Sequence, residues 1–152
     1  RLLRIAVNDE QVPVLSRTSQ GQQGMRLGKQ ETLIGCIAVS AGDRFVIVSA
    51  QGYAKQMAVS ALRLANRGDL GSQSIPFTSK SDRLVGIEVA VVERPMTLLT
   101  SADRMARLSA DTIPQLDKNA TGDRLLTLDK GETITLLAIA SLPPQDSAAA
   151  SS

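Results

Sequence analysis

Thr32-Leu33-Ile34-Gly35-Cys36-Ile37-Ala38-Val39 introduces a pattern that the chain repeats twice, at Arg83–Ala90 and at Thr133–Ala140. The offsets are 51 residues from Leu33 to Leu84 and 50 residues from Leu84 to Ile134. A second register agrees, because Phe45–Gly52 matches Met96–Asp103 at an offset of 51 residues. A fixed period of this length is typical of arrays whose units cannot bury their apolar faces alone. The repeat therefore predicts an all-β, propeller-like array of about three four-stranded blades.

The repeats span residues 1–40, 41–92 and 93–140 of the 152-residue chain. β-Branched runs bounded by turn residues predict strands and hairpins. In the second repeat we expect strands at 45–49, 53–59, 73–77 and 84–92, with one turn of helix as an alternative near residues 58–65. In the third we expect strands at 96–100, 104–108, 124–128 and 134–140. The first repeat offers only 2–7, 12–15, 25–27 and 33–39.

The first repeat contains no counterpart of the strand at residues 45–49. Either the chain was cut within a blade or that strand is donated from elsewhere. Because the chain opens on Arg1 and three blades cannot close a ring, we expect a piece of a larger array. Residues 141–152 are rich in Pro, Ser and Ala, which predicts a disordered tail.

Composition excludes several functions. Histidine is absent, which removes the commonest general base and the commonest metal ligand. We find no nucleophile–base pair and no paired metal-ligand spacing, so we expect no catalytic residue and no metal site. The single Cys36 cannot form an internal disulfide, which indicates a reducing cytoplasmic setting. No apolar run approaches the roughly twenty residues that cross a membrane.

Charge is distributed unevenly along the chain. Residues 1–67 carry nine basic and four acidic residues, a net charge of +5, whereas residues 68–152 carry a net charge of −3. Solvated surface charge would explain this, as would a polyanionic partner that contacts mainly the first half. Arginine outnumbers lysine twelve to five, which suits bidentate contacts with phosphate. Aromatic residues make up only 2% of the chain, which argues against stacking of single-stranded bases.

Glycine recurs in the loop of each repeat, at residues 24, 71 and 122 and again at 21 and 68. Asn119 replaces the glycine in the third repeat, as expected of a position with positive φ. We interpret these loops as a repeated turn geometry. We also interpret them as places where backbone N–H groups and nearby arginines could bind phosphates.

The motifs Gly52-Tyr53-Ala54-Lys55 and Asp82-Arg83-Leu84-Val85-Gly86 resemble the carboxy-terminal domain of the DNA gyrase A protein and its relative in topoisomerase IV. Glu31-Thr32-Leu33-Ile34-Gly35 resembles it too, and the resemblance covers residues 1 to about 140. The third repeat departs, since Asp103 replaces the turn glycine and Ala106 the lysine.

The resemblance implies a β-pinwheel of five or six blades whose basic rim bends and wraps duplex DNA, without catalysis of its own. It implies DNA contacts from the basic residues of these loops and strands, together with turn glycines. The expected DNA contacts are Arg4, Arg17, Arg26, Lys29, Lys55, Arg63, Arg67, Arg104 and Arg107. The expected turn glycines are Gly21, Gly24, Gly52, Gly68, Gly71 and Gly122.

The implied partners are double-stranded DNA, the rest of the gyrase A protein and the gyrase B protein, with no membrane. The implied location is the cytoplasm, at the bacterial nucleoid. We expect no cofactor in this chain, because ATP and Mg²⁺ are used elsewhere in the parent enzyme.

The seven-residue gyrase box of this family, with two Arg and three Gly, is not intact here. Its nearest match is Asn66-Arg67-Gly68-Asp69-Leu70-Gly71. The chain is therefore either the later half of a gyrase domain or a divergent domain of the topoisomerase IV type. A protein-interaction propeller that does not wrap DNA remains the alternative function, and a standalone enzyme is the third hypothesis.

Overall fold

A computed structural model of the chain describes residues 1–139. The predicted tail at 141–152 lies outside the described residues. The structure is built from β-strands and two single turns of 3-10 helix. The strands are β1 (Arg44–Ser49), β2 (Tyr53–Ala58), β3 (Leu84–Val89), β4 (Met96–Thr100), β5 (Met105–Leu108), β6 (Asp123–Arg124) and β7 (Ile134–Ile139). The turns are η1 (Val59–Ala61) and η2 (Ala110–Thr112). The all-β prediction is confirmed.

The strands form two antiparallel sheets, with strand orders β3-β1-β2-β6 and β5-β4-β7. In each, a tight hairpin is followed by a later strand that returns to the other side of the first strand. Phe45 lies opposite Met57 on β2 and opposite Val89 on β3, and Met96 repeats this between Leu108 and Ile139. The same repeat unit therefore folds the same way twice.

Successive repeats interlock, because β6 belongs to the third repeat yet pairs with β2 of the second. Tyr53 lies opposite Arg124, and Ala54 lies opposite Asp123. The fourth strand of the first sheet thus comes from the next repeat along the chain. The second sheet has three strands within residues 1–139, so the expected four strands occur in one sheet and not in both.

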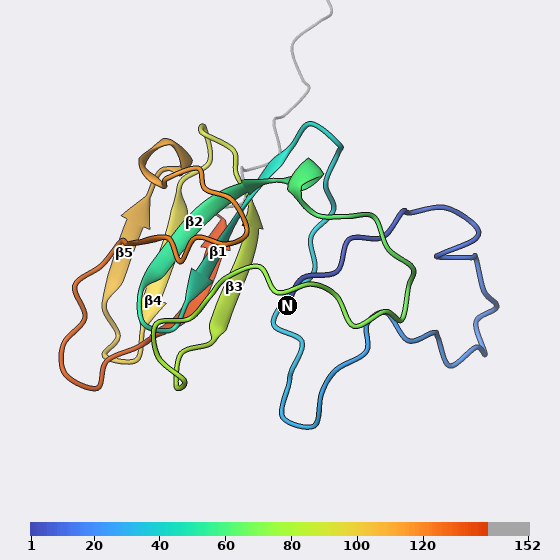
Figure 1. Cartoon of the computed structure of the whole chain (residues 1–152), viewed down its shortest axis with the longest axis horizontal. Coiled ribbons are helices and arrows are strands. Elements are labelled where there is room, and N and C mark those ends of the chain that lie inside the picture. The colour runs from blue at the N-terminus through green and yellow to red at the C-terminus, as the bar shows by residue number, and fades with distance from the viewer. Residues whose placement is uncertain (140–152) are drawn as a thin grey trace, which may run out of the picture.

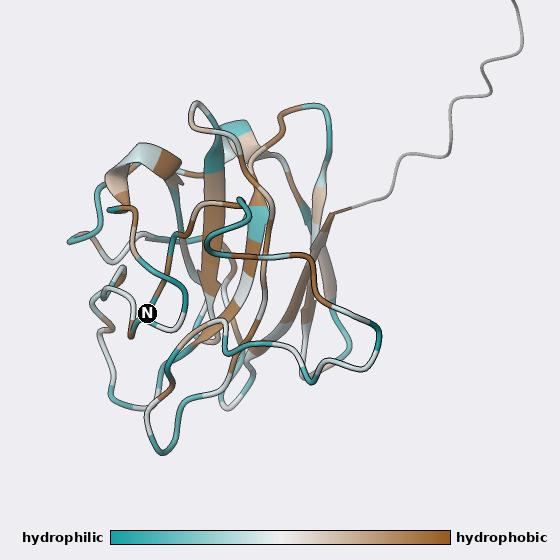
Figure 2. Ribbon diagram, turned by 90° about the vertical axis from the view of Figure 1, so that its right-hand side faces the viewer, coloured by the Kyte–Doolittle hydropathy of each residue, from teal (hydrophilic) through white to brown (hydrophobic). Residues whose placement is uncertain are grey.

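The core is divided by β1, whose last five residues are all buried. One face of β1, with Val46 and Val48, packs against the second sheet through Met96, Leu98 and Ile134. The other face, with Phe45 and Ile47, packs toward the first repeat. Apolar strands lie between polar loops throughout the two sheets (Figure 2).

The strands expected in the first repeat do not form. Residues 1–40 run as irregular loops beside the two sheets, and only Leu2 and Arg4 make isolated β-bridges (Figure 1). The physical reason is visible in the first sheet, where β1 pairs with both β2 and β3. Segments 2–7 and 33–39 correspond to β2 and β3. Their counterpart of β1 is absent from this chain, so neither segment has a ladder partner.

Two further expected strands are also shorter or missing. Residues 73–77 form no strand, although Ser72 bridges Leu2, and the strand expected at 124–128 is reduced to β6. These segments lie at the outer edges, where only a few backbone groups find partners. The alternative of a helical turn near residues 58–65 is realised as η1.

Candidate nucleic-acid interface

Two glycine-bearing loops, from the first and second repeats, lie side by side. The Gly68 N–H donates to the Gly24 carbonyl at 2.8 Å, and the Arg26 N–H donates to the Asp69 carbonyl at 3.0 Å. Gly68 has φ +85°, a conformation that a side chain would strain. These bonds hold the arginine-bearing loops of two repeats together, although more than forty residues separate them in the chain.

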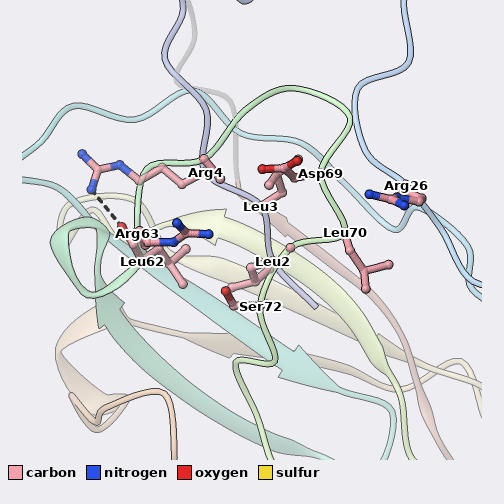
Figure 3. A pocket seen from close by; sticks show the side chains of 11 residues that line it. Leu2, Leu3, Arg4, Arg26, Leu62, Arg63, Asp69, Leu70 and Ser72 are labelled. Carbon is pink, nitrogen blue, oxygen red and sulfur yellow. Dashed lines mark hydrogen bonds between the residues drawn. The ribbon is translucent and has the colours of Figure 1, made fainter.

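A pocket of about 310 Å³ opens between these loops. Three of the predicted DNA-contacting residues line it, namely Arg4, Arg26 and Arg63, together with Asp69. Arg4 and Arg63 lie on one side and Arg26 on the other, with Asp69 between them (Figure 3). The tertiary fold thus collects side chains from both repeats, and the single carboxylate offsets part of their positive charge.

Arg4 also has a structural role. Its guanidinium donates to the Val59 and Leu62 carbonyls, each at 3.1 Å, and the residue is half-buried. These carbonyls belong to η1 and the residue after it, so Arg4 attaches the first repeat to the second. Its charge is partly committed before any ligand arrives.

Arg67 joins three segments. Its Nε donates to the Gln11 carbonyl at 2.6 Å, and a terminal nitrogen donates to the Gln23 carbonyl at 3.1 Å. The Arg67 backbone N–H also donates to the Gln11 side chain at 2.6 Å. Arg67 therefore stabilises the loop pair while its partly exposed guanidinium remains near the basic surface.

Lys55 lies in the interior, and its residue is 0% exposed. Its Nζ donates to the Asp117 and Ala120 carbonyls, each at 2.6 Å. Burial lowers the pKa of this ammonium, and the nearby Asp117 opposes that shift. The prediction that Lys55 contacts DNA is untested, but in this structure its three donors hold a loop of the next repeat rather than facing solvent.

Arg104 pairs with Glu132, which is almost fully buried. Arg104 donates to Glu132 through Nε at 2.8 Å and through a terminal nitrogen at 2.5 Å, and it also donates to the Thr127 carbonyl. The Glu132 carboxylate accepts further bonds from the Thr100 hydroxyl and the Asp129 N–H. These donors, Arg104 first, lower the pKa of Glu132 to about 2. Arg104 is thus a structural residue of the second sheet.

The remaining predicted contacts are exposed. The side chains of Arg17, Arg26, Lys29 and Arg63 make no hydrogen bond or ion pair within residues 1–139. Arg17 and Lys29 lie on loops of the first repeat outside the pocket lining. Arg107 is exposed on β5, away from the loop pair. The structure therefore brings together Arg4, Arg26, Arg63 and Arg67, and it does not bring Lys55, Arg104 or Arg107 to them.

The turn glycines are confirmed at five of the six predicted positions. Positive φ angles occur at Gly21, Gly52, Gly68, Gly71 and Gly122. Gly24 has no positive φ, so its prediction as the equivalent of Gly71 is wrong; its carbonyl instead accepts the bond from Gly68. Asp103, which replaces the turn glycine of the third repeat, adopts φ +57°, whereas Asn119 does not adopt positive φ. The Asn119 N–H is held by its own loop's Asp117 carboxylate, which sets a different turn.

Sequence reasoning missed Gln56, a buried neutral residue. Its side-chain amide donates to the Ala110 and Ile113 carbonyls, the latter at 3.0 Å. It also missed the acids before each strand that ends a repeat, Glu31, Asp82 and Glu132, which accept bonds from nearby N–H groups. The repeat register would have revealed both sets, because Gln56 aligns with Arg4 and Arg107, and the acids align with one another.

Within the described part of the chain, no group of three or more His, Cys, Asp or Glu side chains could hold a metal ion. No helix among residues 1–139 has the length and apolarity needed to cross a membrane.

Interlocked antiparallel blades at a fifty-residue period, with basic loops between them, define a β-propeller repeat protein. The family model of the DNA gyrase C-terminal domain, a β-propeller, matches residues 2–40, 43–90 and 97–141. The chain belongs to this family.

Two curated relatives illustrate the similarity. The chain is 35% identical over 138 residues to the A subunit of DNA topoisomerase 4 from Synechocystis sp., covering 87% of the chain and 15% of that protein. It is 32% identical over 126 residues to the A subunit of DNA gyrase from Staphylococcus epidermidis, covering 82% and 14%. The chain thus spans about one seventh of the length of these relatives.

Solved structures support the fold. The chain superposes on a DNA gyrase A C-terminal domain with a TM-score of 0.72 at 23% identity, covering 84% of the chain and 44% of that structure. It superposes on the C-terminal domain of DNA topoisomerase IV with a TM-score of 0.71 at 18% identity, covering 78% and 38%. At these identities the likeness establishes the β-propeller fold alone.

Proposed function

We propose that this chain is a non-catalytic module of a type IIA topoisomerase, and that it binds duplex DNA and bends it along a basic surface. The observation that carries the proposal is the loop pair, where the fold gathers Arg26 and Arg63 from two repeats around one pocket. Family membership supports the same function. The proposed protein partners are the rest of the gyrase A protein and the gyrase B protein, at the bacterial nucleoid.

The proposed contacts are with phosphates rather than with bases. The candidate side chains lie on loops, and the described structure has no helix long enough to enter a major groove. Arginine on a loop can approach the DNA backbone from outside and form bidentate bonds with phosphate oxygens. Binding should therefore depend strongly on salt and only weakly on sequence.

The test removes three exposed cations whose side chains support no part of the fold. We expect the triple variant Arg17→Ala/Arg26→Ala/Arg63→Ala to bind duplex DNA more weakly. The logarithm of its affinity should fall less steeply with the logarithm of salt, by about 0.9 for each phosphate that the protein no longer neutralises. Fluorescence anisotropy titrations at several salt concentrations measure both quantities.

A matched triple, Arg94→Ala/Lys118→Ala/Lys130→Ala, removes the same charge from exposed positions of the later repeats. We expect it to retain most of the affinity and the salt slope. Equal losses in the two triples would show that net charge alone governs binding. Salt-independent or absent DNA binding by the parent chain would favour a protein-interaction scaffold instead.

A further inference from the structure

One hydrogen-bonding arrangement occurs twice between successive repeats. Arg4 donates to the Val59 and Leu62 carbonyls around η1, and Gln56 donates to the Ala110 and Ile113 carbonyls around η2. Val59 to Ala110 and Leu62 to Ile113 are both offsets of 51 residues. We call the residue that donates these two bonds the turn-holding residue of its repeat.

The backbone forms an equivalent contact beside each turn-holding residue. Arg4 makes a parallel bridge with Leu64, and Gln56 makes a parallel bridge with Gln115. Each contact therefore joins an extended segment of one repeat to the turn and the following extended residues of the next repeat. The donor can be Arg or Gln, because both supply two N–H groups that reach two carbonyls.

Arg107 occupies the same position in the third repeat. It lies opposite Thr97 in the β4–β5 hairpin, as Gln56 lies opposite Val46 in the β1–β2 hairpin. Within residues 1–139, however, its guanidinium has no hydrogen-bond or ion-pair partner, and β5 forms the outer edge of its sheet. Met105 is 76% exposed, whereas Ala54 at the equivalent position is 0% exposed beneath β6.

The first repeat carries the segment that would complete this contact. Val12-Pro13-Val14-Leu15 aligns with Ile113-Pro114-Gln115-Leu116, which bridges Gln56, and a turn precedes it, closed by the Val12 N–H on the Asn8 carbonyl at 2.8 Å. The segment is uncovered, because Val14 is 94% exposed and Val7 is 86% exposed. We call residues 8–15 the leading turn segment.

Charge favours the pairing of these two surfaces. The leading turn segment carries Asp9 and Glu10 in its turn, whereas η1 in the second repeat carries no charged residue. The edge strand β5 and the residue before it carry Arg107 and Arg104. An acidic turn opposite a basic strand edge is electrostatically complementary, which steers association and disfavours the reverse orientation.

We propose that the leading turn segment of one copy of this chain docks on the β5 edge of a second copy, with Arg107 as the turn-holding residue. Arg107 would donate to the carbonyls of the partner's turn, and Val14 would lie beside it as Leu64 lies beside Arg4. The contact joins two different surfaces, so copies associate head to tail. Such an interface either closes a ring or extends into a chain of molecules.

The first test measures self-association of the purified chain, without DNA, by sedimentation velocity over a range of concentrations. Arg107→Ala should weaken association by about tenfold or more, because two hydrogen bonds from a charged donor are removed. Arg107→Gln should retain most of it, because Gln56 performs this role in the second repeat. Lys130→Ala, an exposed cation elsewhere, should have no effect.

The second test determines the orientation by complementation. Val14→Asp should abolish association from the opposite side, because it places a charge in the apolar contact. A mixture of the Arg107→Ala and Val14→Asp chains should associate again as pairs, since each retains the surface that the other lacks. Both substitutions are at exposed positions, and circular dichroism verifies that the fold is retained.

A parent chain that stays monomeric at every concentration would overturn the proposal. So would an equal loss with Arg107→Gln and Arg107→Ala, because the contact needs the two donated bonds and not the charge. A mixture that stays monomeric while the parent chain associates would also overturn it, since association would then use other surfaces.

Discussion

At the scale of single residues, similar basic side chains have different roles in this protein. Lys55 is buried and holds two carbonyls of the next repeat, while Arg17 is exposed and has no partner within residues 1–139. Arg104 is committed to Glu132. A buried cation remains charged only where acceptors replace its water, so each of these positions is defined by its acceptors. DNA contacts are therefore best sought among the cations without such acceptors.

Glu132 allows a test of this structural role through pH. Its pKa is about 2 in the folded chain, against an ordinary value of 4.5. A lowered pKa means that the folded state favours the charged carboxylate. The stabilisation is complete above about pH 4.5 and is lost as the pH falls from about 4.5 to about 2.

We expect Glu132→Gln to lower the unfolding temperature at neutral pH and to flatten the decline of stability over this acidic range. Thermal unfolding followed by circular dichroism across pH measures both effects. Asp111→Asn, at an exposed carboxyl in η2, is the matched control and should leave the profile close to that of the parent chain. An unchanged acid profile in Glu132→Gln would contradict the assigned role.

At the scale of elements, successive repeats pack closely where a glycine ends the recurrent motif. A Cβ added to Gly86 on β3 would clash with the Cβ of Leu137 on β7, and one added to Gly35 would lie 2.9 Å from the Ile87 side chain. Neither glycine has positive φ. The recurrence of glycine at these positions is therefore explained by close approach of strands and not by turn conformation.

Gly86→Ala should destabilise the fold by about 1–3 kcal/mol, because the added methyl group overfills the contact between the two sheets. Chemical denaturation measures the loss. Gly42→Ala is the matched control, since a Cβ there meets nothing within 4 Å, and it should be neutral or slightly stabilising. Equal stability of the two variants would show that β3 and β7 move apart at little cost.

At the scale of the whole molecule, charge and architecture together suggest a curved basic surface. The +5 charge of residues 1–67 lies on the first repeat and the start of the second, including the loop pair. DNA that follows such a surface must bend, and bending a site costs on the order of 1–6 kcal/mol, more where the sequence is stiff.

We therefore expect the chain to shorten the distance between the ends of a bound duplex, measured by energy transfer between end labels. Binding should be tighter to duplexes with flexible TA and CA steps than to A-tract duplexes of equal length. Tight binding that leaves the duplex straight and shows no such preference would indicate simple anchoring of the parent enzyme on DNA.

The sequence by itself determined the repeat, the all-β class, and the strands that contain most of the core. These are local properties, since an alternating or β-branched run such as Met96–Thr100 and a turn glycine such as Gly52 act over a few residues. The family resemblance followed from the same recurrences. Even Asp103 could be anticipated as the residue that takes the positive φ of a missing glycine.

Only the tertiary structure decided which expected strands form and which basic residues remain free. A strand needs a neighbour that supplies backbone partners, so segments 33–39 and 84–89 fold differently although their sequences match. Likewise, the roles of Lys55, Gln56 and Arg107 depend on whether another repeat covers them. Those partners lie about fifty residues away or more, beyond the range over which local sequence patterns act.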